Sequence, residues 1–256
     1  GAEPHGRRAF ELFGPNAGDA ALDVGCGFGD ATLELALRVG RAGSVTGIDV
    51  APEFIELAHE HARAEPLAPI DFRVADAERF DDRTRYDYAF SRFGTMFFER
   101  PLAAFCNLRN LLRPSGRLVM TVWRPLDENP WLGVAKGVAR SFLPSPEPRA
   151  LSCGPGPFSL AEPTVVRELL GAAGFRQISL APSDAATLVG RDLHEAIEFQ
   201  LAIGPAGEIV REAGARAKPL MFELRAALGD ALLPYVQRED GGVAIPSAAW
   251  IVHARI

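Results

Sequence analysis

Short apolar runs alternate with amphipathic segments through the first half of the chain. Apolar runs that end at glycine, proline or acidic residues predict strands at residues 20–24, 44–49, 70–76 and 117–123, and in a run that begins at residue 86. Apolar residues spaced three and four apart predict helices at residues 30–39, 51–64, 101–112 and 162–173. Strands that alternate with helices predict an α/β fold with a mostly parallel sheet.

The pattern changes after residue 123. Residues 124–160 are rich in proline and glycine, which predicts an insertion with one helix and a loop. A sixth strand is expected at 175–180, and residues 191–238 show helical spacing again. We therefore expect a cofactor-binding core, an insertion or gate, a continuation of the core, a helical lid or interface, and a last strand of the core, at residues 1–123, 124–160, 161–190, 191–240 and 241–256.

A glycine turn follows the first strand. That strand carries Asp23 and leads directly into three glycines at alternate positions, Gly25, Gly27 and Gly29, and then into a helix. Glycine allows a sharp turn and a close approach of the backbone to a ligand, and a helix N-terminus presents free N–H groups. The arrangement is typical of the first unit of a doubly wound, ligand-binding sheet, although a glycine turn alone also fits a simple tight turn.

Two acidic residues end the next two strands. Asp49 lies 20 residues after Gly29, where a nucleoside-binding fold places a carboxylate for the ribose hydroxyls. Asp76 ends the third strand, where its carboxylate could accept a hydrogen bond from an adenine amino group. Each acid alone could be a helix N-cap. Because the carboxyl ends of neighbouring strands meet at the ligand-binding edge of such sheets, the three features together favour a nucleoside cofactor.

These segments resemble the motifs of class I S-adenosylmethionine-dependent methyltransferases, in particular the small-molecule enzymes of the ubiquinone and menaquinone biosynthesis type. The matching segments are Leu22-Asp-Val-Gly-Cys-Gly-Phe-Gly, Gly47-Ile-Asp-Val, Val74-Ala-Asp-Ala and Leu111-Leu-Arg-Pro-Ser-Gly-Arg-Leu. The resemblance covers residues 15–125 well. It implies a Rossmann-like, doubly wound, mostly parallel seven-stranded sheet with a reversed last strand and helical insertions.

The resemblance also implies the cofactor, S-adenosylmethionine, and the product S-adenosylhomocysteine. The spacing of the cysteines and histidines gives no reason to expect a metal ion. Asp23 and the glycines would face the methionine part of the cofactor, Asp49 would hold the ribose, and Val50 would pack on the adenine. Asp76 and Ala77 would meet the edge of the adenine. The expected cofactor-binding residues are Asp23, Gly25, Cys26, Gly27, Gly29, Asp49, Val50, Asp76, Ala77 and Ser91.

The loop after the fourth strand lies beside the methyl donor in this family. Here it combines aromatic and thioether side chains with one cation, Arg92. A cation beside an apolar run needs an anionic partner, either a group of the acceptor or an internal acid such as Glu99 or Asp127. The expected substrate-pocket residues are Arg92, Phe93, Met96, Phe97, Trp123 and Phe158. The apolar members of this set could equally be ordinary core.

We therefore expect in-line transfer of a methyl group to a small-molecule acceptor, an aromatic or anionic metabolite, at oxygen or nitrogen, or else at carbon. No histidine lies inside a family motif, so the sequence identifies no catalytic base. One alternative is an NAD-dependent oxidoreductase, disfavoured because the glycines lack the Gly-x-Gly-x-x-Gly spacing. The other alternative is a non-catalytic cofactor-binding or interaction protein.

Composition and charge indicate which partners and which cellular compartment to expect. The chain has 256 residues, of which 48% are hydrophobic, as in globular proteins. Its net charge of −6 argues against a nucleic-acid-binding face. The three cysteines lack metal-ligand spacing, which fits a reducing cytoplasm, and no apolar run reaches the length of a membrane span. We expect a cytoplasmic monomer or homodimer without nucleic-acid or membrane partners.

The start of the chain has two interpretations. Residues 7–13 form a short amphipathic stretch. The family resemblance implies a helix that folds over the cofactor, whereas composition alone also allows a frayed terminus.

The two insertions generate a first prediction. They carry Phe142, Phe158, Phe199 and Tyr235, and we expect them to cover the mouth of the pocket and exclude water. Hydrogen exchange at residues 124–160 and 191–238 should slow when S-adenosylhomocysteine is added. Protection confined to residues 21–77 would contradict the lid and favour an oligomer contact instead.

Overall fold

The computed structural model describes residues 3–62, 68–144, 156–237 and 239–256. The described chain divides into two compact units. The sheet unit comprises His5–Arg124, Cys153–Ser183 and Ala249–Ile256, and the helical unit comprises Gly1–Pro4, Pro125–Ser152 and Asp184–Ala248. Among the described residues, no helix combines the length and the apolar character that crossing a membrane requires.

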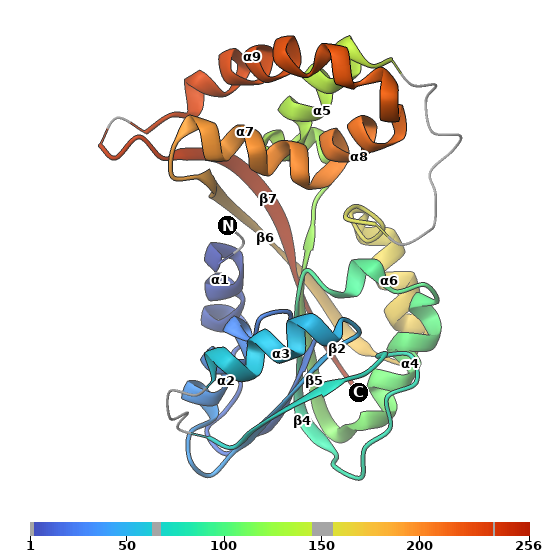
Figure 1. Ribbon diagram of the computed structural model, residues 1–256. Coiled ribbons are helices and arrows are strands. Elements are labelled where there is room, and N and C mark those ends of the chain that lie inside the picture. Colours follow the sequence, from blue (N-terminus) through green and yellow to red (C-terminus); the bar gives the residue numbers. More distant parts are fainter. Residues whose placement is uncertain (1–2, 63–67, 145–155, 238) are drawn as a thin grey trace. The chain divides into compact units, whose positions relative to one another are not determined.

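The described strands form one seven-stranded sheet in the order β3-β2-β1-β4-β5-β7-β6 (Figure 1). They are β1 (Ala20–Val24), β2 (Ser44–Asp49), β3 (Ile70–Val74), β4 (Tyr86–Arg92), β5 (Leu112–Trp123), β6 (Arg176–Gly190) and β7 (Val243–Arg255). Strands β1 to β5 pair in parallel, and β7 pairs antiparallel with β5. The expected fold class, including the reversed last strand, is therefore confirmed.

Helices cover both faces of the sheet unit. In Figure 1, α1, α2 and α3 lie on one side of the sheet, and α4 and α6 lie on the other. Their bounds are α1 (Glu3–Phe13), α2 (Asp30–Val39), α3 (Pro52–His61), the short η1 (Thr95–Phe97), α4 (Pro101–Leu111) and α6 (Pro163–Ala172). Proline opens α3, α4 and α6, because its fixed φ suits the first helical position and the missing N–H is not needed there.

The helical unit contains the remaining helices. They are η2 (Leu126–Glu128), α5 (Pro130–Phe142), α7 (Leu193–Ala202), α8 (Gly204–Ala213), η3 (Gly214–Arg216), η4 (Lys218–Leu220), α9 (Met221–Leu232) and η5 (Leu233–Tyr235). Helices α5, α8 and α9 share one apolar core, with Ala135, Leu224 and Leu228 fully buried. The Asp192 side chain caps α7 by accepting from the Glu195 N–H at 2.8 Å.

The N-terminal residues form a helix, so the frayed terminus is wrong. Ala9 and Phe10 of α1 are buried, and the Phe10 ring stacks on Phe90 of β4 with their centroids 4.4 Å apart. Phe10 and Phe90 thus belong to one apolar core, which also includes Tyr88. This packing fixes α1 against the sheet.

Strand β6 is longer than the sequence predicted. Its 15 residues extend ten positions beyond the expected end at residue 180. Polar residues point inward there: the Thr187 hydroxyl donates to Ser247 Oγ at 2.8 Å, and the Ser247 hydroxyl donates to the carbonyl of Ala185 at 2.9 Å. Because these hydroxyls are hydrogen-bonded, Thr187 and Ser247 can be buried although both are polar.

Candidate functional site

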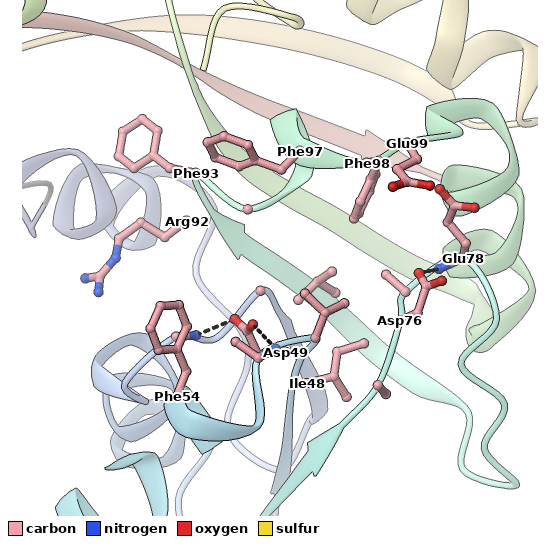
Figure 2. A pocket seen from close by; sticks show the side chains of 18 residues that line it. Ile48, Asp49, Phe54, Asp76, Glu78, Arg92, Phe93, Phe97, Phe98 and Glu99 are labelled. Atoms are coloured by element: carbon pink, nitrogen blue, oxygen red, sulfur yellow. Dashed lines mark hydrogen bonds between the residues drawn. The ribbon is translucent and has the colours of Figure 1, made fainter. Parts of the chain in front are cut away.

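The pocket lies at the carboxyl ends of the parallel strands, within the sheet unit. It has a volume of about 640 Å³ and is lined by residues that follow β1, β2, β3 and β4. Figure 2 shows Phe54, Arg92 and Phe93 at one side, here called the aromatic end. Asp76, Glu78 and Glu99 lie at the other, the acidic end, and Asp49 lies between the two. An elongated pocket with one apolar end and several carboxylates suits a ligand with chemically distinct parts.

The glycine turn after β1 forms the floor of this pocket. The N–H groups of Gly25 and Cys26 both donate to the carbonyl of Ile48, at 2.9 and 3.0 Å. Gly25 has a φ of +69°, and a Cβ there would lie 3.0 Å from the Cα of Gly94. Gly27 has a φ of +54°, but a Cβ there would meet no atom within 4 Å. Gly25 therefore permits a close approach of two backbones, whereas Gly27 is required by its φ alone.

Asp49 joins the ends of β1 and β2. Its Oδ2 accepts from the N–H of Gly27 at 2.9 Å, and its Oδ1 accepts from the N–H of Ala51 at 3.1 Å, as the dashed lines in Figure 2 show. Each carboxylate oxygen has a second lone pair, so the group can still accept from a ligand. The side chain is thus held in place while it keeps capacity for two further hydrogen bonds.

The acidic end is tied to the start of α4. Asp76 accepts from the N–H of Glu78 at 2.9 Å. The Glu78 carboxylate accepts from the backbone N–H of Arg100 at 2.6 Å and from its Nε at 2.7 Å. The Asn107 side chain donates to the carbonyls of Ala77 and Phe80. Two walls of the pocket, one after β3 and one after β4, are therefore fixed to the same helix.

The aromatic end contains the cation that the sequence singled out. Arg92 forms an ion pair with Asp30, with 3.7 Å between Nη2 and Oδ2, and not with Glu99 or Asp127 as the sequence suggested. Phe93 has a φ of +62°, and its ring stacks on Trp123 with centroids 3.8 Å apart. A phenylalanine in the left-handed region is strained, which is a feature of functional sites.

Asp23 is fully buried beneath the glycine turn. Its Oδ2 accepts from the Thr32 hydroxyl at 2.7 Å, while its Oδ1 has no hydrogen-bond partner among the described residues. Burial raises the pKa of Asp23 from 3.8 to about 6, and the Thr32 hydrogen bond and the Arg92 charge offset part of that rise. A buried oxygen without a partner, next to a pocket, is consistent with a site that a cationic group completes.

The residues predicted from the sequence fall into two groups, apart from Phe158, which does not line the pocket. Those that line the pocket are Gly25, Gly27, Asp49, Val50, Asp76, Ala77, Arg92, Phe93 and Phe97. Those that lie buried behind this lining are Asp23, Cys26, Gly29, Ser91, Met96 and Trp123. Ser91 donates to the carbonyl of Val24 at 2.7 Å, so it joins β4 to β1.

Of the expected insertion or gate at residues 124–160, residues 145–155 lie outside the described part of the chain. The N–H of Gly156 and the hydroxyl of Ser159 both donate to the carbonyl of Met96, at 3.0 and 2.6 Å. Phe158 lies between them and is half-buried. This segment therefore packs against the loop after β4.

Sequence reasoning missed Phe54 and Glu78 as pocket residues. Phe54 lies in the first turn of α3, five residues after Asp49, and Glu78 follows Asp76 by two. Their proximity in sequence to the two strand-end acids was the signal that could have found them. Within the part of the chain that the structure describes, no three His, Cys, Asp or Glu side chains gather in a way that could hold a metal ion.

Comparison with known proteins places the chain in a family. A model of the methyltransferase domain family matches residues 21–116. The aklanonic acid methyltransferase DauC of Streptomyces sp. (strain C5) is 34% identical over 120 residues, which are 46% of this chain and 54% of that protein. Nocamycin O-methyltransferase of Saccharothrix syringae is 30% identical over 207 residues, 77% of this chain and 69% of that protein.

A structural comparison agrees. The crystal structure of a protein from Bacillus halodurans C-125, assigned as a methyltransferase, has a TM-score of 0.59 and covers 98% of this chain and 97% of that one, at 14% identity. At that identity the likeness shows the fold alone. With the family model and the relatives, the chain belongs to the class I methyltransferases, which use S-adenosylmethionine. The resemblance drawn from the motifs is confirmed, although the chain spans only 54% of the first relative's length.

The burial of Asp23 predicts how stability depends on pH. Its folded pKa of about 6 lies above the ordinary 3.8, so the unfolded chain releases the proton first as the pH rises. The contribution of Asp23 to stability should therefore fall by about 3 kcal/mol between pH 4 and pH 6 and then level off. Acids with lowered pKa values, such as Asp82, act in the opposite sense, so the test compares two proteins. Between pH 4 and pH 7, urea unfolding of the parent protein should show this loss relative to Asp23→Asn.

The exposed Asp81 provides the control, because Asp81→Asn should retain the loss. An equal pH dependence in the parent protein and Asp23→Asn would contradict the raised pKa of Asp23.

Proposed function

We propose that the pocket binds S-adenosylmethionine, with its adenosine toward the acidic end and its methionine part near the glycine turn. Asp49 would accept the ribose hydroxyls, and Asp76 with Ala77 would meet the adenine edge. Three observations support this orientation: the free lone pairs of Asp49, the open space beside Gly27, and the unpartnered Oδ1 of Asp23. The first two fit a ribose above the turn, and the third fits a cationic group of the methionine part.

We further propose that the chain is a methyltransferase acting on a small anionic aromatic acceptor. Bound S-adenosylmethionine supplies a methyl group already activated on a sulfonium. The protein then needs to hold the acceptor in line with the S–CH₃ bond at about 3 Å and keep water away. Phe93 and Phe97 provide apolar surface for an aromatic ring at the aromatic end of the pocket.

The single observation behind the anionic acceptor is Arg92. Its side chain is 20% exposed, and its Asp30 partner is 65% exposed at 3.7 Å. Such a long, exposed pair contributes about 0–1 kcal/mol, which leaves the guanidinium able to bind a second anion. A carboxylate or phenolate would gain a charge-assisted hydrogen bond there. The first relative acts, by its name, on an acid, which is consistent with this choice.

The two alternatives lose support. The family assignment gives Asp76 a role that an NAD-dependent oxidoreductase does not explain, and the glycines lack the spacing of such enzymes. A non-catalytic binding protein would not need a strained, aromatic-lined end beside the expected methyl donor.

We also propose a cytoplasmic monomer or homodimer that acts on free metabolites and not on nucleic acid. The net charge of −6 and the acidic end of the pocket support this proposal, because both repel phosphate backbones. Cys26 and Cys106 are free thiols, as expected in a reducing compartment.

Removal of the Asp49 carboxylate tests the cofactor site. Asp49→Ala should weaken binding of S-adenosylmethionine at least tenfold in calorimetry, because each lost charge-assisted hydrogen bond is worth about 1.5–3 kcal/mol. The apo protein should also melt slightly lower, since the N–H groups of Gly27 and Ala51 lose their acceptor. Asp81→Ala, an exposed acid outside the pocket, is the control. Unchanged affinity in Asp49→Ala would remove Asp49 from the site.

Substitution of Arg92 tests the acceptor class. The probes are 3-hydroxy-2-naphthoate and its amide, which have nearly the same shape but differ in charge, titrated into the protein saturated with S-adenosylhomocysteine. The parent protein should bind the acid at least tenfold more tightly than the amide. Arg92→Met should abolish this preference, while the affinity for S-adenosylhomocysteine stays within twofold.

Asp30→Asn is the matched control, since it removes the internal partner and keeps the cation. It should retain or increase the preference for the acid. A parent protein that binds both probes equally, or neither, would overturn the anionic acceptor.

A further inference from the structure

Two consecutive residues of α1 contact two consecutive residues of the pocket. His5 packs against Phe93, and Gly6 packs against Arg92. All four belong to the sheet unit, and both pocket residues lie at the aromatic end. His5 and Gly6 do not line the pocket, so any effect they have on a ligand passes through Arg92 and Phe93.

Gly6 leaves the space that the Arg92 side chain occupies. A Cβ at Gly6 would lie 2.9 Å from Cδ of Arg92 and 3.6 Å from its Nη1. Glycine is a poor helix former compared with alanine, and Gly6 lies inside α1. The close passage of the arginine stem gives a physical reason for a glycine at this position.

His5 supports the strained wall of the pocket. Its ring is fully buried and meets the rings of Phe93 and Trp123 edge-on, with centroids 5.9 and 5.5 Å apart. Its Nδ1 lies 2.9 Å from the hydroxyl of Ser183, which fixes the plane of the ring. His5, Phe93 and Trp123 thus form a packed group of three rings, and the strained Phe93 is in contact with both of the others.

The helix itself is anchored independently of these contacts. Ala9 is fully buried, and Phe10 stacks on Phe90 one turn further along α1. If a methyl group is added at Gly6, the flexible stem of Arg92 is therefore the part that must move. The guanidinium would shift while α1 and the cofactor-binding residues keep their positions.

We propose that His5 and Gly6 are positioning residues of the acceptor pocket: Gly6 sets its charge selectivity through Arg92, and His5 sets its affinity through Phe93. Gly6 determines where the Arg92 guanidinium lies, and His5 holds the Phe93 ring that forms the adjoining wall. The proposal rests on the proposed role of Arg92 and adds that the N-terminal helix, and not the pocket lining alone, specifies the acceptor.

Gly6→Ala is the decisive variant. It should reduce the preference for 3-hydroxy-2-naphthoate over its amide at least fivefold in the S-adenosylhomocysteine complex. The melting temperature should stay the same or rise, because alanine favours the helix. A merely structural role would lower the melting temperature and weaken both probes alike.

The matched control is Gly171→Ala in α6, an exposed helical glycine where a Cβ would meet no atom within 4 Å. It should leave the preference unchanged. In an Arg92→Ala background, which removes the stem, Gly6→Ala should not change the affinity for either probe. A further loss of affinity in that double variant would overturn the route through Arg92.

His5 provides a second, independent variant. His5→Ala should weaken binding of both probes at least fivefold by releasing Phe93, and His5→Phe should restore most of that binding because it keeps an edge-on ring. If Arg92→Ala removes the preference but Gly6→Ala and His5→Ala change nothing, the positioning role fails and the anionic acceptor stands. If Arg92→Ala itself has no effect, the proposed acceptor class fails.

Discussion

The hydrogen bond from the Gly27 N–H to the Asp49 carboxylate joins the ends of β1 and β2, and the pocket depends on it. The strands themselves are already in register, with Val24 opposite Ile48. Beyond the strands the chain turns away from the sheet. In this turn the Ile48 carbonyl accepts from the N–H groups of Gly25 and Cys26, and the Asp49 carboxylate accepts from the N–H of Gly27. This local pairing makes a left-handed glycine turn stable at an edge where no strand continues.

The features that the sequence predicted well are local ones. The glycine turn, Asp49 and Asp76 each lie within a few residues of a strand end, so the strand pattern alone places them at one edge of the sheet. The contacts that the sequence did not reveal are long-range. His5 and Ser183 are 178 positions apart, and nothing in either local pattern indicates that they meet.

Whether a residue lines the pocket or supports the lining from behind depends on how its side chain is buried, and the residue type alone does not show this. Phe97 is 54% exposed and lines the pocket, whereas Met96 beside it is 1% exposed. The turn at η1 directs these neighbours to opposite sides, and Met96 instead contacts the Trp123 N–H through its sulfur at 3.3 Å. Similarly, Thr187 is buried in β6 because its hydroxyl donates to Ser247 of β7, a partner 60 positions away that the local pattern of β6 does not reveal.

The Glu78–Arg100 pair has a consequence for engineering. The Glu78 side chain is 6% exposed, and both of its oxygens accept from Arg100, which directly precedes α4. The loop after β4 and the loop after β3 are therefore not separable modules. A chimera that exchanged residues 93–100 with those of a relative would leave a nearly buried carboxylate without its donors, unless position 78 were transplanted with them.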